Sequence, residues 1–562
     1  ANAVTLIEDD NSDAVGSLAT ININGSAPFT LGTGITAVAG AGTTINASTA
    51  TGALTITGSN FETITLGTGD DTLKLGATQI SQVIASAKVN YNGGDGTDTL
   101  VLGAQDLTAS GFLNGAATAT DVVTNFETLT ATGTVAGNAT TDTARAIDAN
   151  VISGITSIEV ELDNNDSATS NADGEDLDLT VSDLIAGQTL KVSGLMADTH
   201  AENLTTVTLD MDSPTGTSDK ITFESFASSA ATAHVNKFSL ITVNTTSVSS
   251  TAEKVEILEI KASNPDVTTT VGTTILDIDA ANTATINITG SSNLSIASIE
   301  SYDSSTADTT VTTIDASAFT GNLTLGSSTA DFMDTAADDV TLTLGTGTNI
   351  IYVGTDLGTG DTIDGSLGTS DTLYATGSSA GVPAAVTNVE TINWTAGNAT
   401  SNSLEKFTGY TTLDITNGTN TSTITKLLDT GVTVKSDDID NTKTLTVNKT
   451  TAGGTLSFEL DTATLSAGSL STNATTLDLA ATGTDSNGDY ISDALAVAGS
   501  VTTINLSGGG ETSVAGTHST FTLDGATSVA ALTSTYDGSL TISGQSWDTS
   551  NGATVTTGST TV

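Results

Sequence analysis

The sequence predicts an all-β, multidomain chain of β-sandwich-like and short β-helix or β-roll layers. Three observations predict this fold class. Threonine makes up about a fifth of the 562 residues, and β-branched side chains favour strands over helices. Apolar and polar residues alternate in short runs along the whole chain, which is the pattern of half-buried strands. Gly, Asn, Asp and Ser separate these runs, as turn residues do.

Each short alternating run is interpreted as a strand of about four to seven residues. Two segments depart from this pattern and are interpreted as helices. Apolar residues at helical spacing favour a helix over residues 78–88, and a weaker pattern covers Glu224–Asn236. The clearest predicted strands are Leu18–Ile23, Leu54–Ile56, Val207–Leu209, Thr285–Ile288, Leu342–Leu344, Leu445–Val447, Leu477–Leu479 and Thr502–Leu506.

The length of the chain is that of several ordinary domains. Shifts in composition suggest three boundaries and therefore four β regions. The predicted regions are an N-terminal one with glycine- and aspartate-rich loops (1–135), one with an acidic loop (136–265), one with a second copy of those loops (266–400) and a C-terminal one (401–562).

The charge of the chain is strongly negative, with 64 acidic against 13 basic residues and a formal net charge of −51. Such a chain repels nucleic acid and anionic membrane surfaces, so neither is expected as a partner. Divalent cations bound only in the folded state would relieve the self-repulsion. The alternative is a purely solvated acidic surface, as in halophilic proteins. Cysteine is absent, so disulfides contribute nothing, and bound metal is their usual substitute. No apolar stretch is long enough to span a membrane.

Three phrases occur twice and in the same order, which indicates an internal duplication. A looser phrase, Thr-Thr-apolar-Asp, recurs at irregular spacing, so a strict solenoid repeat is not predicted. The first set reads LGTGDDTLKLG at 66–76, NGGDGTDTLVL at 92–102 and DVVTNFETLTA at 121–131; the second reads LGTGTNIIYVG at 344–354, GSLGTSDTLY at 365–374 and VTNVETINW at 386–394.

Residues Gly93–Val101 match the nonapeptide G-G-x-G-x-D-x-U-x in full, and Gly67–Leu73 match it without its first glycine. The glycines let the backbone turn tightly and direct carbonyl oxygens inward, while the aspartate adds a carboxylate. Calcium prefers six to eight oxygen ligands, and stacked loops of this kind provide them. Hairpin turns favour the same residues, so simple turns are the alternative.

These motifs, with the V-[ST]-N-[FV]-E-T phrase and TTIDASAFTGNLTL at 312–325, resemble RTX-type proteins, especially the RTX-containing bacterial surface-layer (S-layer) proteins. The resemblance implies calcium-dependent folding outside the cell, type I secretion and assembly into a two-dimensional array. It implies calcium ligands in the first copy at Asp71 and Asp98, with oxygens around Gly67, Gly69, Asp70, Gly94 and Gly96. It implies counterparts in the second copy at Asp361, Asp364 and Asp371, around Gly358 and Gly360.

Two features depart from the family pattern. The predicted helix at 78–88 separates the loops of Asp71 and Asp98, so a long calcium β-roll is not expected. Asn349 replaces an aspartate in the second copy, which weakens that site. Two further acidic clusters are candidate calcium sites: one around Asp173 and Asp176, and one at Asp485 and Asp489.

Catalysis is not expected. H-E-x-x-H is absent, and the three histidines share no motif. Aromatic residues make up only 4% of the chain, whereas glycan-cleaving enzymes usually line their clefts with them. The sequence therefore predicts a calcium-dependent structural protein of the cell surface that assembles with itself into an S-layer lattice or filament, with surface polysaccharide as a candidate anchor. The alternative is a calcium-stabilised secreted adhesin or glycan-binding protein.

Overall fold

We analysed a computed structural model of the chain. The structure describes residues 3–8, 18–32, 43–58, 61–75, 90–103, 122–134, 145–163, 178–195, 205–212, 218–226, 236–245, 255–263, 272–280, 283–300, 311–329, 331–332, 339–355, 357–365, 368–377, 384–395, 401–416, 421–436, 444–460, 468–482, 494–508, 520–524, 529–536, 539–543 and 554–557. The chain divides into two compact units, Ala1–Ile314 and Asp315–Val562. The four predicted regions remain a prediction.

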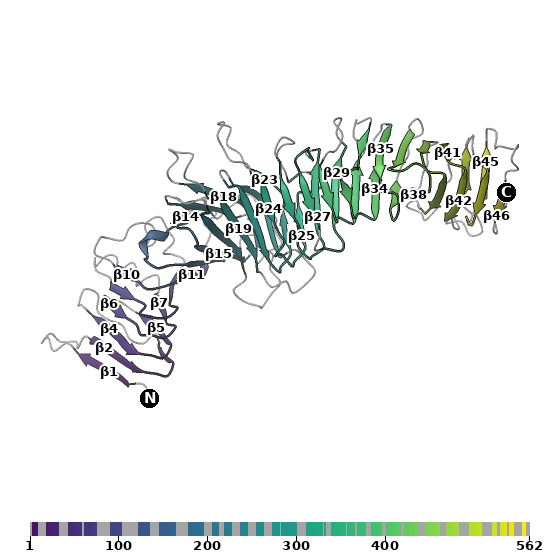
Figure 1. Cartoon of the computed structure of the whole chain (residues 1–562). Helices are drawn as coiled ribbons and strands as arrows, with labels where there is room; N and C mark the ends of the chain where they lie inside the picture. Colours follow the sequence, from purple (N-terminus) through teal and green to yellow (C-terminus); the bar gives the residue numbers. More distant parts are fainter. Residues whose placement is uncertain are drawn as a thin grey trace, which may run out of the picture. The chain divides into compact units, whose positions relative to one another are not determined.

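Both units are built from β-strands that form long parallel sheets. Within each unit, consecutive strands largely alternate between two sheets, so that one turn of the chain, here called a coil, adds a strand to each (Figure 1). Among the described strands, the pairing of β1 with β2 is antiparallel and every other pairing given is parallel. This is the arrangement of a β-helix or β-roll solenoid.

The first unit contains three series of neighbouring strands. A short 3₁₀ turn, η3 (Ala149–Val151), follows β12, and β24 (Thr313–Asp315) lies at the junction of the units. The first series is β1 (Ala3–Glu8), β2 (Leu18–Gly25), β4 (Thr44–Ala50), β6 (Thr63–Thr65), β8 (Asn90–Asn92) and β10 (Val122–Thr124). The second is β3 (Phe29–Leu31), β5 (Leu54–Gly58), β7 (Thr72–Leu75), β9 (Thr99–Gly103), β11 (Thr128–Thr134), β13 (Ser157–Asp163), β15 (Thr189–Leu195), β17 (Lys220–Ser225), β19 (Ile257–Ala262) and β21 (Thr285–Gly290). The third is β12 (Arg145–Asp148), β14 (Asp178–Leu184), β16 (Thr205–Met211), β18 (Asn236–Thr245), β20 (Thr273–Asp279), β22 (Leu294–Ile296) and β23 (Ile299–Glu300).

The second unit also contains three series. One is β26 (Thr341–Thr343), β28 (Thr362–Asp364), β30 (Ala385–Thr387) and β33 (Phe407–Thr408). Another is β25 (Leu323–Leu325), β27 (Ile350–Gly354), β29 (Thr372–Thr376), β31 (Thr391–Thr395), β34 (Thr412–Thr416), β36 (Thr433–Ser436), β38 (Thr455–Leu460), β40 (Thr476–Ala481), β42 (Thr503–Gly508), β44 (Ala531–Ser534) and β46 (Thr554–Thr557). The last is β32 (Asn402–Ser403), β35 (Ser422–Leu427), β37 (Thr444–Lys449), β39 (Gly468–Thr472), β41 (Ala494–Gly499), β43 (Thr520–Asp524) and β45 (Ser539–Ser543).

The core forms because alternate residues of each strand point inward and parallel pairing keeps them in register. Leu73, Leu100 and Leu129 pair across β7, β9 and β11, and each is almost completely buried. Burying one such side chain stabilises the fold by roughly 1.5–3 kcal/mol. Each coil therefore depends on its neighbours for most of its buried apolar area.

The Thr-Thr phrase found in the sequence marks a defined coil-to-coil contact. Thr312 and Thr313 both donate their main-chain N–H to Ala284 O, at 3.0 and 3.2 Å, and Thr312 Oγ1 lies 3.3 Å from the same oxygen. Three donors thus share one carbonyl where the chain enters a strand, which satisfies main-chain groups that would otherwise be exposed at the turn. The same arrangement occurs at Thr411–Thr412 on Glu390 O and at Thr475–Thr476 on Gly454 O.

The predicted strands are confirmed, because each lies within a strand or within one residue of its end. The sandwich-like alternative is wrong for the described strands, since sandwiches are built from antiparallel strands and these pair in parallel. The helix predicted over residues 78–88 lies outside the described residues. The second predicted helix is wrong at both ends, because Glu224 belongs to β17 and Asn236 begins β18.

Candidate metal centre

The two glycine-rich loops of the first unit lie directly on top of each other. The Asp95 N–H donates to Gly67 O at 3.0 Å, and the Thr97 N–H donates to Asp70 Oδ1 at 2.9 Å. Gly94 has a φ of 99°, and a side chain there would overlap Gly67 O. The glycine is therefore required by both its left-handed conformation and the close stacking of the loops. The two loops therefore stack directly although they are separated in the sequence.

Acidic side chains cap the main chain of each preceding coil. The Leu54 N–H donates to Asp71 Oδ1 at 2.7 Å, the Asp71 N–H to Asp98 Oδ1 at 2.7 Å, and the Asp98 N–H to Glu127 Oε2 at 2.7 Å. We call Asp71, Asp98 and Glu127 the first ladder. Charge-assisted bonds of this kind are stronger than neutral ones. The side chains of the first ladder thus link four successive turns.

The middle carboxylate of this ladder is buried and only half paired. Asp98 is fully buried, and its Oδ2 has no hydrogen-bond partner among the described residues. Burial, together with the neighbouring charges of Asp71 and Glu127, raises the pKa of Asp98 to about 7, although the bond from the Asp71 N–H opposes the shift. Burial also raises the pKa of Asp71. A proton or a cation beside Asp98 is therefore favoured near neutral pH.

The second unit repeats the ladder with one change. The Leu323 N–H donates to Asn349 Oδ1 at 3.2 Å, the Asn349 N–H to Asp371 Oδ1 at 3.0 Å, and the Asp371 N–H to Glu390 Oε2 at 2.8 Å. We call Asn349, Asp371 and Glu390 the second ladder. Asp371 is fully buried, and within the part of the chain that the structure describes its Oδ2 has no hydrogen-bond partner, as at Asp98. The duplicated phrases therefore fold into the same constellation twice.

Asn349 supplies a donor where the first ladder has a carboxylate. Its Nδ2 lies 2.9 Å from Asp371 Oδ1, 3.3 Å from Gly345 O and 3.2 Å from Gly347 O. Burial raises the pKa of Asp371 to about 6, and the two bonds from Asn349 lower it against that effect. The second ladder consequently holds one negative charge fewer than the first.

The other residues predicted for the second copy lie on a different sheet from Asp371. Asp361, which precedes β28, accepts the Val340 N–H at 2.9 Å and the Gly358 N–H at 2.5 Å. It therefore caps the main chain as Asp71 does, but outside the second ladder. Asp364 ends β28 and accepts from Thr387 Oγ1 at 3.0 Å. A side chain at Gly360 would overlap the carboxylate of Asp339.

The glutamates of both ladders belong to the V-[ST]-N-[FV]-E-T phrase, whose role the sequence analysis did not assign. The asparagine of the same phrase adopts the left-handed conformation in both units, with φ of 57° at Asn125 and 56° at Asn388. Each donates its Nδ2 to the preceding coil: Asn125 to Asn92 Oδ1 at 2.9 Å, and Asn388 to Asp364 Oδ1 at 3.1 Å. The repetition of this phrase in both copies was the sequence signal that could have identified its glutamate and its asparagine.

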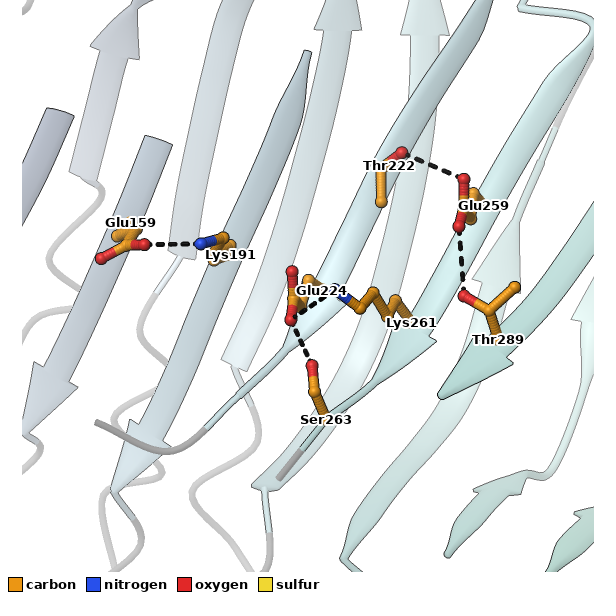
Figure 2. A network of polar contacts seen from close by, with 8 residues as sticks. All are labelled: Glu159, Lys191, Thr222, Glu224, Glu259, Lys261, Ser263 and Thr289. Atoms are coloured by element: carbon orange, nitrogen blue, oxygen red, sulfur yellow. Dashed lines mark hydrogen bonds and ion pairs between the residues drawn. The ribbon is translucent and has the colours of Figure 1, made fainter. Parts of the chain in front are cut away.

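A second polar network lies on the first unit, on strands β13 to β21 (Figure 2). Lys191 pairs with Glu159 at 2.6 Å, and Lys261 pairs with Glu224 at 3.1 Å. Ser263 Oγ donates to the carboxylate of Glu224, whose side chain is only 9% exposed. On the next strand Glu259 accepts from Lys220 Nζ at 2.6 Å and from Thr289 Oγ1 at 3.1 Å. These lysines neutralise carboxylates locally in a chain that is otherwise strongly acidic.

The ladders fit a hard cation in part. The unpaired Oδ2 atoms of Asp98 and Asp371 are carboxylate ligands of the kind that calcium prefers, whereas both oxygens of Asp71 already accept main-chain N–H groups, from Leu54 and Gly67. No group of three or more acidic, His or Cys side chains is placed to hold a metal within the described ranges. A calcium ion at Asp98 would therefore depend on main-chain carbonyl oxygens as well. Asp173, Asp176, Asp485 and Asp489 lie outside the described residues.

Comparison with known proteins adds no assignment. No protein-family model, no curated protein and no solved structure matches the chain. The part of the chain that the structure describes contains no helix of the length and apolar character needed to cross a membrane.

Proposed function

We propose that the chain is a calcium-dependent structural protein of the bacterial cell surface that assembles with itself into an extracellular lattice or filament. One observation carries the calcium part of the proposal. Asp98 and Asp371 occupy equivalent positions in two units, and each has a buried carboxylate oxygen without a hydrogen-bond partner. An unpaired charge in such a place is costly, and a bound cation removes the cost.

The composition supports a cation over a permanently protonated acid. The net charge of −51 destabilises the folded chain, and divalent cations bound there reduce the repulsion. At a free calcium concentration of 100 times Kd, each site adds about 2.7 kcal/mol to the free energy of unfolding. Because the ladders hold successive coils together, loss of calcium would loosen the solenoid at these turns.

The assembly part of the proposal is supported by the likeness of the motifs to RTX-containing S-layer sequences and by the parallel solenoid itself. Type I secretion belongs to the same resemblance. The proposed role is non-catalytic, in keeping with the absence of H-E-x-x-H from the sequence. Surface polysaccharide is the candidate anchor of such a layer.

Negative-stain microscopy with and without millimolar calcium tests the proposal, alongside thermal unfolding of the same samples. Assemblies should form with calcium and dissolve in EGTA, and the Tm should fall on chelation.

The double variant Asp98→Asn/Asp371→Asn should lose most of the calcium-dependent rise in Tm. Asp478→Asn is the matched control, since Asp478 is an exposed carboxylate bonded to Asn505 Nδ2 at 2.7 Å. A chain that stays folded and assembled after exhaustive chelation contradicts the proposal, and one that stays monomeric with calcium contradicts the assembly part.

A further inference from the structure

A cleft of about 470 Å³ opens between two stacked turns of the second unit. One turn joins β35 to β36 and the other joins β37 to β38. Gly431 and Gly453 lie on these turns with φ of 80° and 94°, and a methyl group at either would meet no atom within 4 Å. The glycines thus face open space and keep the cleft free of side chains. Its walls combine apolar and hydroxyl groups: Leu427, Leu428, Val432, Ala452, Leu456, Thr430, Thr451, Thr455 and Ser457.

The ammonium group of a buried lysine lines this cleft. Lys449 is only 7% exposed, and its Nζ donates to Thr455 O at 2.8 Å. Among the described residues no carboxylate lies within ion-pair distance of it, whereas Lys435 pairs with Glu459 at 3.1 Å. A methyl group at Gly454 would lie 3.2 Å from Nζ. An ammonium has three donors, so this one retains capacity for an anionic ligand.

Among the described residues, the cleft is also lined by one carboxylate, that of Asp429. Asp429 accepts the Thr451 N–H at 2.8 Å and so joins the two turns. That bond, together with the more distant charge of Lys449, lowers the pKa of Asp429. The cleft therefore presents one positive group, one negative group and several hydroxyls. A ligand with one carboxylate and several hydroxyl groups complements all three.

We propose that this cleft binds a hydroxy-carboxylate of monosaccharide size, of the uronic acid class. The ligand's carboxylate pairs with the Lys449 ammonium, and its hydroxyls donate to Asp429 and bond to the threonines. The volume lies within the range of about 300–1,000 Å³ for small-molecule sites. Asp429 disfavours a second carboxylate in the ligand. This site is separate from both ladders, and the inference does not depend on calcium or on assembly.

Saturation-transfer NMR and calorimetry on the full chain test the site with D-glucuronate as the probe. D-Glucuronate should bind at least tenfold more tightly than D-glucose, which lacks the carboxylate, or acetate, which lacks the hydroxyl groups. Lys449→Met should weaken glucuronate binding at least tenfold. Lys435→Met is the matched control, because it removes a lysine of the same unit that is already paired, and it should leave binding unchanged.

The folded state of each variant is checked by its Tm and circular dichroism. Lys449→Arg, which keeps the charge, should retain most of the binding and provides the test if Lys449→Met does not fold. Equal binding of glucuronate and glucose overturns the proposal, as does unchanged binding by a folded Lys449→Met. Tighter binding of the acidic dipeptide Gly-Asp than of glucuronate overturns the assignment to a hydroxy-carboxylate.

Discussion

The main-chain N–H of Asp71 donates to Oδ1 of Asp98 in the following coil, at 2.7 Å. A side chain from one coil thus satisfies a turn in its neighbour, and the same bond joins Asn349 to Asp371 at 3.0 Å. The two ladders differ at the first residue of each pair, where one unit has a carboxylate and the other an amide. The chain therefore contains the aspartate form and the asparagine form of the same ladder position, at Asp71 and Asn349.

Asp71→Asn should convert the first ladder into the form of the second. Without calcium the amide removes one of several crowded negative charges, but its Nδ2 cannot accept the Gly67 N–H as the carboxylate does, so the free energy of unfolding in EGTA should change by less than about 1 kcal/mol. The stabilisation by calcium should fall in the same variant. Chemical denaturation with and without calcium measures both effects.

Asn349→Asp is the reciprocal control. It places a carboxylate beside Asp371, so the free energy of unfolding should fall in EGTA, and calcium should restore more of it than in the unchanged chain. Equal effects of Asp71→Asn with and without calcium would show that Asp71 acts only as a cap of the main chain.

The calcium-free chain should lose stability as the pH rises through about 6 to 7. The pKa values of Asp98, about 7, and Asp371, about 6, lie above the ordinary value of 3.8. The protonated carboxyl groups stabilise the folded state, and this stabilisation is complete below about pH 4. It is lost as the two groups ionise in the folded state. Urea unfolding in EGTA at pH 5 and pH 8 measures the difference. Asp98→Asn/Asp371→Asn should show a smaller difference, and an unchanged pH dependence would contradict the assignment.

Lys261→Met should destabilise the first unit more than Lys191→Met does. Lys261 pairs with Glu224, whose side chain is 9% exposed, whereas Lys191 pairs with Glu159, whose side chain is 26% exposed. Removing Lys261 leaves a nearly buried carboxylate without its counter-charge, with only the Ser263 hydroxyl as partner, and the expected loss is about 1–3 kcal/mol. Loss of the Lys191–Glu159 pair, whose carboxylate is the more exposed of the two, should cost less than about 1 kcal/mol. Thermal unfolding at low and high salt compares them, and equal losses would contradict the prediction.

Asn402→Leu should stabilise the second unit. Asn402 is fully buried, and neither atom of its amide group has a hydrogen-bond partner. Trp394 Nε1 beside it is also buried without a partner, and both side chains lie against Gly377. An apolar side chain of similar shape removes the cost of the unpaired amide, about 1–3 kcal/mol. A loss of stability on urea unfolding would instead show that buried water satisfies Asn402.

The strands were predictable because the alternation of apolar and polar residues is local. Leu54–Ile56 and Leu477–Leu479, for example, lie within β5 and β40. The β-helix or β-roll layers were predicted with them, but a strict solenoid repeat was not, because the coils differ in length: Asp71 and Asp98 are 27 residues apart, whereas Asn349 and Asp371 are 22 apart. A search for a fixed period cannot detect such a repeat.

The residues of the candidate site were predictable, but the main-chain groups to which they bond were not. The nonapeptide match identified Asp71 and Asp98, and the duplication identified Asp371. The sequence did not indicate that Asp361 caps a different sheet, because that depends on which strands become neighbours. Glu127 and Glu390 were visible only as part of a repeated phrase, since a glutamate that caps a main-chain N–H has no distinctive local pattern.

The capping ladders also impose an order on folding. Leu54 N is capped by a side chain 17 residues later, Asp71 N by one 27 residues later, and Asp98 N by one 29 residues later. A coil cannot complete its turn until the following coil has closed over it. Each coil of the ladder segment is therefore complete only once its C-terminal neighbour has closed, and the coil formed last is the least protected until the next one arrives.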